Sequence, residues 1–299
     1  MEGKSEKTIL VTGATGKQGG AVARHLTTSG WHVRILTRDP NKPEAKRCRE
    51  MGMEVMKANL DDKNSLLKAA DGVYGIYSVQ SLEQGVEVEA RQGKMLADVA
   101  KNRGIRHFVY SSVGSANRNT KIPHFESKWQ VEQHISSLKI PATIFRPVWF
   151  MNNFLMPQFR DSILKGTLTM PLKPDKTLEM IAVDNIGGFV TEAFENPDEF
   201  IGQAIDIAGD ELTIPQVANK LSKVVGHDVK FVEMPMKEMR KASKEWAIMF
   251  QWFNDVGYKS DIPKLRRMLP DLMDFEMWLQ KVGREHFVGE KVAIGHTSN

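Results

Sequence analysis

Short apolar runs alternate with longer helix-like stretches through the first half of the chain. Strand-like runs cover residues 8–11, 32–38, 54–57, 72–80, 106–112 and 142–147. Several of them are almost continuously apolar, as is typical of parallel strands that are covered on both faces. The regular alternation of strands and helices therefore predicts an α/β fold with a doubly wound, mostly parallel sheet.

The segment between the first strand and the first helix is rich in glycine. Gly13, Gly16 and Gly19 are spaced three residues apart, and a helical pattern follows over residues 21–26. Such glycines let the backbone turn tightly and approach a pyrophosphate, while the N-terminus of the helix offers free N–H groups. This context predicts a Rossmann dinucleotide-binding turn, with the cofactor-binding residues Gly13, Thr15, Gly16, Lys17, Gln18 and Gly19.

Beyond residue 147 the pattern is less regular, although strand-like runs occur near residues 178–183 and 203–208. We expect a Rossmann domain over residues 1–150, to whose sheet these two strands return. The remaining residues, 151–299, are expected to form a smaller, irregular α+β domain on the substrate or partner side.

The end of the second strand predicts which dinucleotide is bound. In NAD sites a carboxylate about 20 residues beyond the glycines binds the ribose 2′-hydroxyl, whereas an arginine there favours the 2′-phosphate. Arg38 occupies this place, so we predict NADP(H) as the preferred cofactor, with Lys42 as a second phosphate contact. Asp39 keeps NAD(H) open as the alternative, although its position before Pro40 equally suits a turn or a helix cap.

The next two strand ends should complete the cofactor site, because ligands of doubly wound sheets bind at the carboxyl ends of the strands. Adenine is expected after the third strand, and the fourth strand should also reach the cofactor. These strand ends contribute Asn59, Leu60, Gln80 and Ser81. We interpret Asp61 and Asp62 as N-caps of the following helix.

Three residues further along are candidates for catalysis. Ser111 ends the fifth strand and is placed to hydrogen-bond a substrate oxygen. His124 and Lys128 are four residues apart and share one face of the next helix. A lysine beside the nicotinamide ribose can hold its hydroxyls and lower the pKa of an adjacent acid. The alternative is that Ser111 caps a strand, His124 is a surface histidine and Lys128 is a solvated charge.

Aromatic side chains and a methionine gather in the second half of the chain. They either line an apolar substrate cleft or pack in the core, where aromatic residues are commonly buried. The residues are Trp149, Phe150, Met151, Phe154, Phe250, Trp252, Phe253 and Tyr258.

The composition of the chain limits the kinds of partner that we expect. The 299 residues are 41% hydrophobic and 26% charged, and the net charge of +4 comes from scattered basic residues, so we expect no nucleic-acid partner. The single cysteine, Cys48, fits a reducing compartment. Because no apolar run has membrane-spanning length and the N-terminus lacks the apolar core of a signal peptide, we expect a cytoplasmic protein without a membrane partner. The histidine spacing predicts no metal site.

The glycine turn, the segment over residues 37–40, the serines that end the fifth strand, Lys128 and residues 146–154 together resemble the NmrA-like family of atypical short-chain dehydrogenases/reductases. The resemblance covers nearly the whole chain. It implies NADP(H) or NAD(H) as cofactor, with Arg38 on the 2′-phosphate and Lys128 as the cofactor-binding lysine. It also implies a loop over the nicotinamide, whose residues are Trp149, Phe150, Met151 and Asn152.

Position 124 departs from ordinary short-chain dehydrogenases, which have a tyrosine four residues before the lysine. His124 stands there instead, and a histidine also occurs in the human redox-sensor branch of the family. Two functions follow. One is an NAD(P)H-dependent reductase of a small apolar carbonyl or quinone-type acceptor, with Lys128, His124 and Ser111 as catalytic residues. The other is a non-catalytic NADP(H) redox sensor, whose occupancy alters the affinity for a regulatory protein partner.

Overall fold

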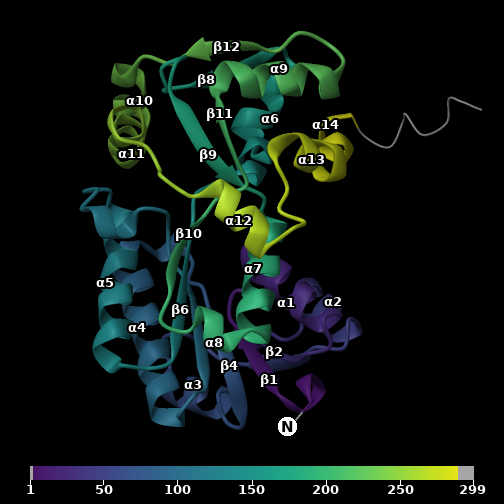
Figure 1. Ribbon diagram of the computed structural model, residues 1–299, viewed down its shortest axis with the longest axis vertical. Coiled ribbons are helices and arrows are strands. Elements are labelled where there is room, and N and C mark those ends of the chain that lie inside the picture. Colours follow the sequence, from purple (N-terminus) through teal and green to yellow (C-terminus); the bar gives the residue numbers. More distant parts are fainter. Residues whose placement is uncertain (1–2, 289–299) are drawn as a thin grey trace, which may run out of the picture. The chain divides into compact units, whose positions relative to one another are not determined.

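The computed structural model describes residues 3–288 and divides the chain into two compact units (Figure 1). The first unit contains Met1–Pro147 and Val183–Ile207. The second contains Val148–Ala182 and Ala208–Asn299. The first stretch ends close to the expected boundary at residue 150, and the segment over residues 183–207 rejoins the first unit.

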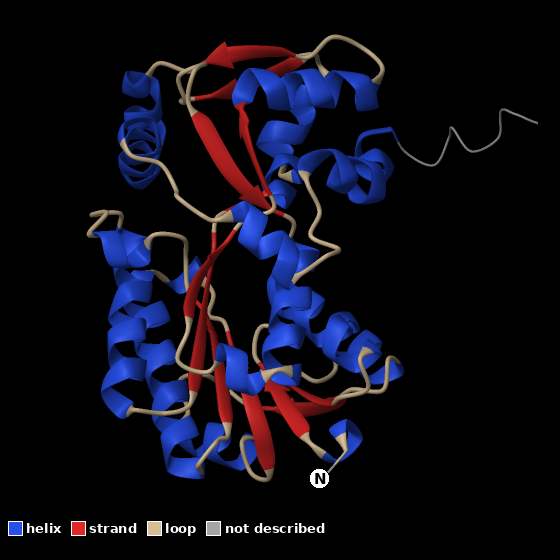
Figure 2. Cartoon of the chain, viewed as in Figure 1, coloured by secondary structure: helices blue, strands red, loops and turns tan. Residues whose placement is uncertain are grey.

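The first unit is built on a parallel sheet of seven strands in the order β10-β6-β5-β4-β1-β2-β3 (Figure 2). Its strands are β1 (Thr8–Val11), β2 (His32–Thr37), β3 (Glu54–Lys57), β4 (Val73–Ser78), β5 (His107–Ser111), β6 (Ala142–Pro147) and β10 (Ala204–Ile207). The chain proceeds outward from β1 in one direction to β3 and then in the other direction through β4. This order is that of a doubly wound sheet, so the predicted fold class is confirmed.

Helices cover both faces of this sheet. Figure 1 shows α3, α4 and α5 on one face and α1 and α7 on the other. The helices of this unit are α1 (Lys17–Thr28), α2 (Pro43–Glu50), α3 (Lys63–Ala69), α4 (Val86–Arg103), α5 (Pro123–Leu138), α7 (Val183–Glu195) and α8 (Pro197–Phe200), and its 3-10 turns are η1 (Lys4–Glu6), η2 (Leu82–Gln84) and η3 (Ala116–Arg118). Their ends carry the expected signals, since Asp62 caps α3 and Gly104 ends α4 in the left-handed conformation.

The core of the first unit explains why its strands are so apolar. Leu10, Ile76 and Phe108 are completely buried between the sheet and the helices. Gly75 lies where α7 packs directly on β4, because a Cβ atom there would come within 2.5 Å of the ring of Phe194. Close packing on both faces excludes water from the sheet and makes its carboxyl edge a rigid support.

One buried polar network joins three elements of this unit. Arg146 on β6 forms an ion pair of 2.6 Å with Glu132 on α5 and one of 3.5 Å with Asp206 on β10. The hydroxyl of Ser112 also donates to Glu132. Because every charge in the network has a partner of opposite sign, the charges are tolerated at this depth.

The second unit contains two small sheets. The first has the order β11-β9-β7 and the second pairs β12 with β8 in parallel. The strands are β7 (Trp149–Phe150), β8 (Thr167–Met170), β9 (Thr177–Ile181), β11 (Asp210–Thr213) and β12 (Lys230–Glu233). The helices are α6 (Pro157–Leu164), α9 (Ile214–Val225), α10 (Met236–Ala242), α11 (Lys244–Asp255), α12 (Ile262–Met268), α13 (Phe275–Trp278) and α14 (Arg284–Val288), with the 3-10 turn η4 (Met151–Leu155) and the π-helical turn η5 (Leu279–Gly283).

These sheets correct one expectation from the sequence. The run near residues 178–183 was expected to return to the main sheet, but it forms β9, which pairs with β11 and β7. The run near residues 203–208 forms β10 and pairs with β6. An apolar run predicts a strand, whereas the choice of its neighbours depends on the path of the whole chain.

Over residues 3–288, no helix combines the length and the apolar character that crossing a membrane would require.

Candidate functional site

A pocket of about 500 Å³ lies at the carboxyl ends of the strands in the first unit. It opens where β1 has β4 on one side and β2 on the other, the point at which the strand order reverses. Open α/β sheets bind ligands at such a point. The residues that line it are Thr12, Gly13, Thr15, Gly16, Lys17, Gln18, Gly19, Leu36, Thr37, Arg38, Asp39, Lys42, Ala58, Asn59, Leu60, Val79, Gln80, Ser81, Glu83, Gln84 and Gln92.

The glycine turn lines this pocket, and two of its glycine positions have no room for a Cβ atom. Gly13 has φ +65°, and a Cβ atom at Gly19 would lie 2.4 Å from the backbone of Gly13. Gly16 is the N-cap of α1 and has no side chain to accept from the first N–H groups of the helix. Those N–H groups have no partner within the helix and point at the space beyond its N-terminus. The turn therefore fits the pyrophosphate of a dinucleotide.

Thr12 directly follows β1 and connects the glycine turn to the residue that follows β4. Its hydroxyl donates to the carbonyl of Val79 at 2.8 Å and accepts from the N–H of the same residue at 2.8 Å. The two strand ends that flank the pocket are thus held at a fixed separation. Gly13 contributes to the same close approach, because a Cβ atom there would lie 2.8 Å from the side chain of Val79.

The end of β2 presents two cations to the pocket. Arg38 and Lys42 both line it, as the sequence predicts for a 2′-phosphate site. Asp39 lines it as well, but one of its carboxylate oxygens accepts the N–H of Asn41 at 2.9 Å. This contact is the turn that the sequence offered as an alternative for Asp39.

Asn59 and Leu60, which were predicted to flank the adenine, line the pocket, and the two aspartates that follow them make different contacts. Asp62 caps α3 by accepting the N–H groups of two residues in its first turn. Asp61 is not a cap, which corrects the sequence interpretation. It pairs with Arg91 at 2.6 Å and accepts from Gln92 at 3.0 Å, and the hydrogen bond from Arg91 lowers the pKa of its carboxyl group.

Several lining residues were not among the predicted contacts. Thr12, Leu36, Thr37, Ala58 and Val79 lie next to predicted residues, whereas Glu83, Gln84 and Gln92 lie beyond them. Glu83 and Gln84 belong to η2, directly after the predicted contacts Gln80 and Ser81, so the same strand-end argument could have included them. Gln92 lies in the middle of α4. Its place on the pocket wall depends on how α4 packs, and no local motif marks it.

Ser111 lies beside the glycine turn but does not line the pocket within the described part of the chain. It is 1% exposed, and its hydroxyl is hydrogen-bonded to the amide of Gln18. The same amide donates to the hydroxyl of Tyr77 at 2.8 Å. Burial raises the pKa of Tyr77, so this phenol remains protonated and takes part as a neutral hydrogen-bonding group.

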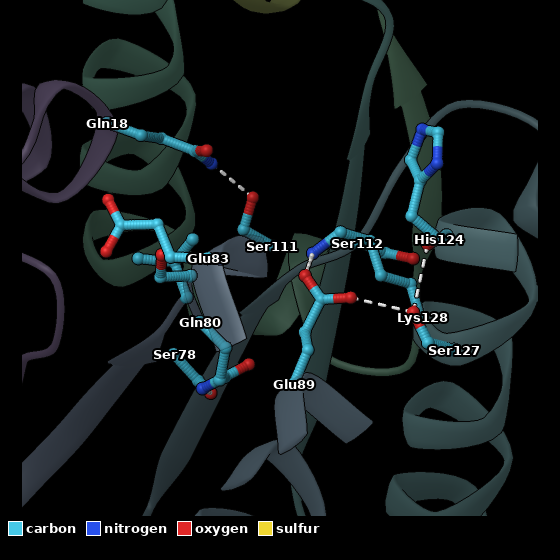
Figure 3. Close-up of polar contacts among 12 residues, drawn as sticks. Gln18, Ser78, Gln80, Glu83, Glu89, Ser111, Ser112, His124, Ser127 and Lys128 are labelled. Atoms are coloured by element: carbon cyan, nitrogen blue, oxygen red, sulfur yellow. Dashed lines mark hydrogen bonds and ion pairs between the residues drawn. The ribbon is translucent and has the colours of Figure 1, made fainter. Parts of the chain in front are cut away.

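Lys128 is neither solvated nor isolated, so the interpretation as an exposed charge is wrong. Its side chain is 13% exposed, and its ammonium lies 2.9 Å from the carboxylate of Glu89 on α4. Figure 3 shows this ammonium pointing toward Glu89, whereas the ring of His124 extends in another direction. His124 lies in the first turn of α5 and packs edge-on against Phe125. His124 and Lys128 therefore share a helix face, but the imidazole ring and the ammonium group point in different directions.

The segment expected to cover the nicotinamide belongs to the second unit. Trp149 and Phe150 form β7, Met151 and Asn152 begin η4, and Met151 is completely buried. The contact of these four residues with a cofactor remains a prediction from the family resemblance.

Most of the aromatic residues singled out in the second half of the chain are buried in the core. Trp149 packs against Phe250 at 5.7 Å and Phe253 at 6.4 Å between ring centroids, and Phe154 is completely buried. Core packing is therefore the better interpretation for these four residues. Trp252 and Tyr258 are partly exposed and contact each other at 5.6 Å.

Comparison with known proteins agrees with this geometry. The chain matches the NmrA-like family over residues 5–279. It is 29% identical over 297 residues to an NmrA-like family domain-containing protein of Dictyostelium discoideum, covering 92% of this chain and 98% of that protein.

Two solved structures share the fold. One is NmrA, a negative transcriptional regulator, in complex with NADP, with a TM-score of 0.76, 21% identity and coverage of 93% of this chain and 95% of that one. The other is an NADPH-dependent quinone oxidoreductase of Escherichia coli complexed with NADPH, with a TM-score of 0.78, 20% identity and coverage of 91% and 98%. On the match that spans residues 5–279, this chain belongs to the NmrA-like family.

Proposed function

We propose that this protein binds NADP(H) in the pocket of its first unit and reduces a small, apolar carbonyl or quinone-type acceptor. The observation that carries the proposal is one pocket whose lining combines the glycine turn, in which Gly13 and Gly19 leave no room for a Cβ atom, with Arg38 and Lys42. Two related folds were solved with NADP or NADPH bound, and one of them is named as a quinone oxidoreductase.

Each part of the pocket suits one part of the cofactor. The glycine turn and the N-terminus of α1 would hold the pyrophosphate, and the cations at the end of β2 would hold the 2′-phosphate. Asn59 and Leu60 would flank the adenine, while Gln80 and Ser81 lie further along the pocket. When bound, NADPH supplies the hydride for the reduction of the acceptor.

The candidate catalytic residues have separate functions in this proposal. Lys128 binds and orients the nicotinamide ribose, and His124 donates a proton to the reduced acceptor. Ser111 is buried and already bonded to Gln18, so it orients that amide beside the glycine turn. NAD(H) is the weaker cofactor, since it lacks the phosphate that Arg38 would bind.

A redox sensor is the second candidate. The observation that favours it is His124, which stands where ordinary short-chain dehydrogenases have a tyrosine, together with the resemblance in fold to a transcriptional regulator. Cofactor occupancy would then change the loops near residues 80–90 and 115–125 and so the affinity for a protein partner, provided that the partner binds the two conformations unequally.

The test begins with a titration of the purified protein with NADPH and NADH. The NADPH complex is then mixed with a panel of quinones, enones and aldehydes, and the absorbance of reduced nicotinamide is followed. Loss of absorbance that requires both the protein and an acceptor supports the reductase. Tight NADPH binding without turnover on the whole panel favours the sensor, and absence of NADPH binding contradicts both.

A histidine variant separates binding from proton transfer in the same assay. If His124 donates the proton, His124→Ala lowers the single-turnover rate by about 10²–10⁴-fold while NADPH affinity stays the same. An unchanged rate and pH profile would remove His124 from the mechanism.

A further inference from the structure

A buried carboxylate on α4 faces the lysine of the proposed site. Glu89 is 1% exposed, and one of its oxygens lies 2.9 Å from the ammonium of Lys128 (Figure 3). Its other oxygen accepts a hydrogen bond of 2.7 Å from the hydroxyl of Ser127. We infer that Glu89 is a positioning residue that holds the ammonium of Lys128 in place for the dinucleotide. This inference rests on the proposed binding of NADP(H).

The contact follows from how α4 and α5 pack. A Cβ atom at Gly93 would lie 2.9 Å from the side chain of Val131, so the glycine lets the two helices approach closely. Glu89 is one helical turn before Gly93, and Ser127 is one turn before Val131. Residues four apart share a helix face, so the close approach also brings Glu89 against Ser127 and its neighbour Lys128.

The hydrogen-bonding groups show what Glu89 leaves available. Its two oxygens are both engaged, which fixes the orientation of the carboxylate. A lysine ammonium has three N–H donors, and one such contact leaves two of them for other acceptors. Glu89 thus restrains the flexible side chain of Lys128 and leaves two N–H donors of its ammonium available. A residue that positions a ligand-binding side chain must do both.

The pair also lies beside the pocket wall. Gln92, which lines the pocket, is three residues after Glu89 and therefore on the same side of α4. Gln80, which lines the pocket as well, has its side-chain amide oxygen Oε1 3.1 Å from the position that a Cβ atom of Gly93 would take. The helix face that holds Glu89 is thus continuous with the lining of the cofactor pocket.

A purely structural ion pair would behave differently from a positioning pair. Breaking a purely structural pair lowers the melting temperature of the free protein, and NADPH affinity then changes only as far as the fold itself is disturbed. A positioning residue acts through its partner, so its effect on the ligand disappears once the partner is removed. A double-mutant cycle measures this difference directly.

The experiment determines the Kd of NADPH for the wild type, Glu89→Gln, Lys128→Met and the double variant, with thermal melting of each protein recorded in parallel. We expect Glu89→Gln to weaken NADPH about tenfold, within the range usual for coupled residues. In the Lys128→Met background the same change should alter the Kd less than about twofold. Glu87→Gln is the matched control, because it removes an exposed carboxylate from the first turn of the same helix and should leave the Kd unchanged.

Two further variants keep the test decisive if Glu89→Gln does not fold. Glu89→Asp retains the charge and should recover part of the affinity. Ser127→Ala leaves both charges in place and removes one of the contacts that orient Glu89. It should weaken NADPH about threefold in the wild-type background and not in the Lys128→Met background.

The outcomes are distinguishable. Equal losses from the Glu89 or Ser127 change in both backgrounds would overturn the inference and leave the proposed function standing. If Lys128→Met binds NADPH as tightly as the wild type, the inference and the proposed contact of Lys128 with the ribose are both overturned, whereas NADP(H) binding in the pocket still stands. A wild-type protein that does not bind NADPH would overturn the proposed function and the inference with it.

Discussion

We assign the proposed preference for NADP(H) mainly to Arg38, which lines the pocket together with Lys42. We expect Arg38→Ala to weaken NADPH roughly 10- to 150-fold, because a hydrogen bond to a charged group contributes about 1.5–3 kcal/mol. NADH lacks the 2′-phosphate, so its affinity should change little. Calorimetric titration of both cofactors measures the difference.

Arg47→Ala is the control for a general loss of positive charge. Arg47 lies on α2 and is exposed, and it is absent from the pocket lining that the described residues form. It should leave both affinities unchanged. If Arg38→Ala weakens NADPH and NADH equally, then Arg38 does not bind the 2′-phosphate.

Some of the site residues could be predicted because the sequence motif that marks them is local. The glycines and Arg38 lie at fixed offsets from strands that the apolar pattern reveals, so their position in the pocket follows from the chain itself. Glu89 and Asp61 gave no such signal. Each is defined by a partner on another helix, Lys128 for one and Arg91 for the other, and such pairs form only when the helices pack.

At the scale of elements, the central strands of the first unit were predictable because they are buried on both faces. Continuous apolar runs mark β4 and β6, and the structure places both in the main sheet. The second unit lacks this pattern. β7 has only two residues, and β11 is half-buried and polar, so neither shows a periodicity from which the small sheet around β9 could be foreseen.

One strand contains a histidine that makes the stability of the fold depend on pH. His107 begins β5 and is completely buried, with its Nε2 atom 2.8 Å from the hydroxyl of Thr143 on β6. That hydroxyl already donates to the carbonyl of Phe200, so it accepts from a neutral imidazole. Burial lowers the pKa of His107 to about 4, below the value of about 6.5 in an unfolded chain.

The sign of the effect follows from proton uptake. Above pH about 6.5 the ring is neutral in both states, and as the pH falls toward about 4 the unfolded chain binds a proton that the folded protein does not. The contribution of His107 is therefore fully present at neutral pH and is lost in this window, by about 3 kcal/mol in total.

Urea denaturation at several pH values tests this prediction. His107→Gln is expected to be less stable than the wild type at pH 8 but to lose less free energy of unfolding between pH about 6.5 and 4. Parallel pH profiles for the two proteins would show that His107 is not the group responsible.

At the scale of the whole molecule, the two units interleave along the chain. The segment over residues 183–207 supplies α7, α8 and β10 to the first unit after the chain has already begun the second. No linker rich in glycine, proline or serine marks the points at which the chain passes between the units. From the sequence we expected a first domain over residues 1–150, joined by returning strands near residues 178–183 and 203–208. Of these two runs, the second forms a strand of the main sheet and the first does not.

Because the predicted cofactor contacts of the first unit are concentrated in a few loops, NADPH should protect a small, defined set of backbone amides from hydrogen exchange. A ligand present at about 100 times its Kd stabilises the state that binds it by about 2.7 kcal/mol. Protection should be greatest in the segments that line the pocket, namely residues 12–19, 36–42, 58–60 and 79–84. Peptides from β8 and β12 of the second unit provide the comparison.

Hydrogen exchange followed by mass spectrometry, with and without NADPH, measures each of these segments separately. Arg38→Ala at the same NADPH concentration is the control, and it should lose most of the protection because less of it is bound. The peptide that contains residues 149–152 tests whether the loop implied by the family resemblance meets the nicotinamide. Protection that spared residues 12–19 would contradict the pocket as the cofactor site, because the pyrophosphate must lie against the glycine turn if that pocket binds NADPH.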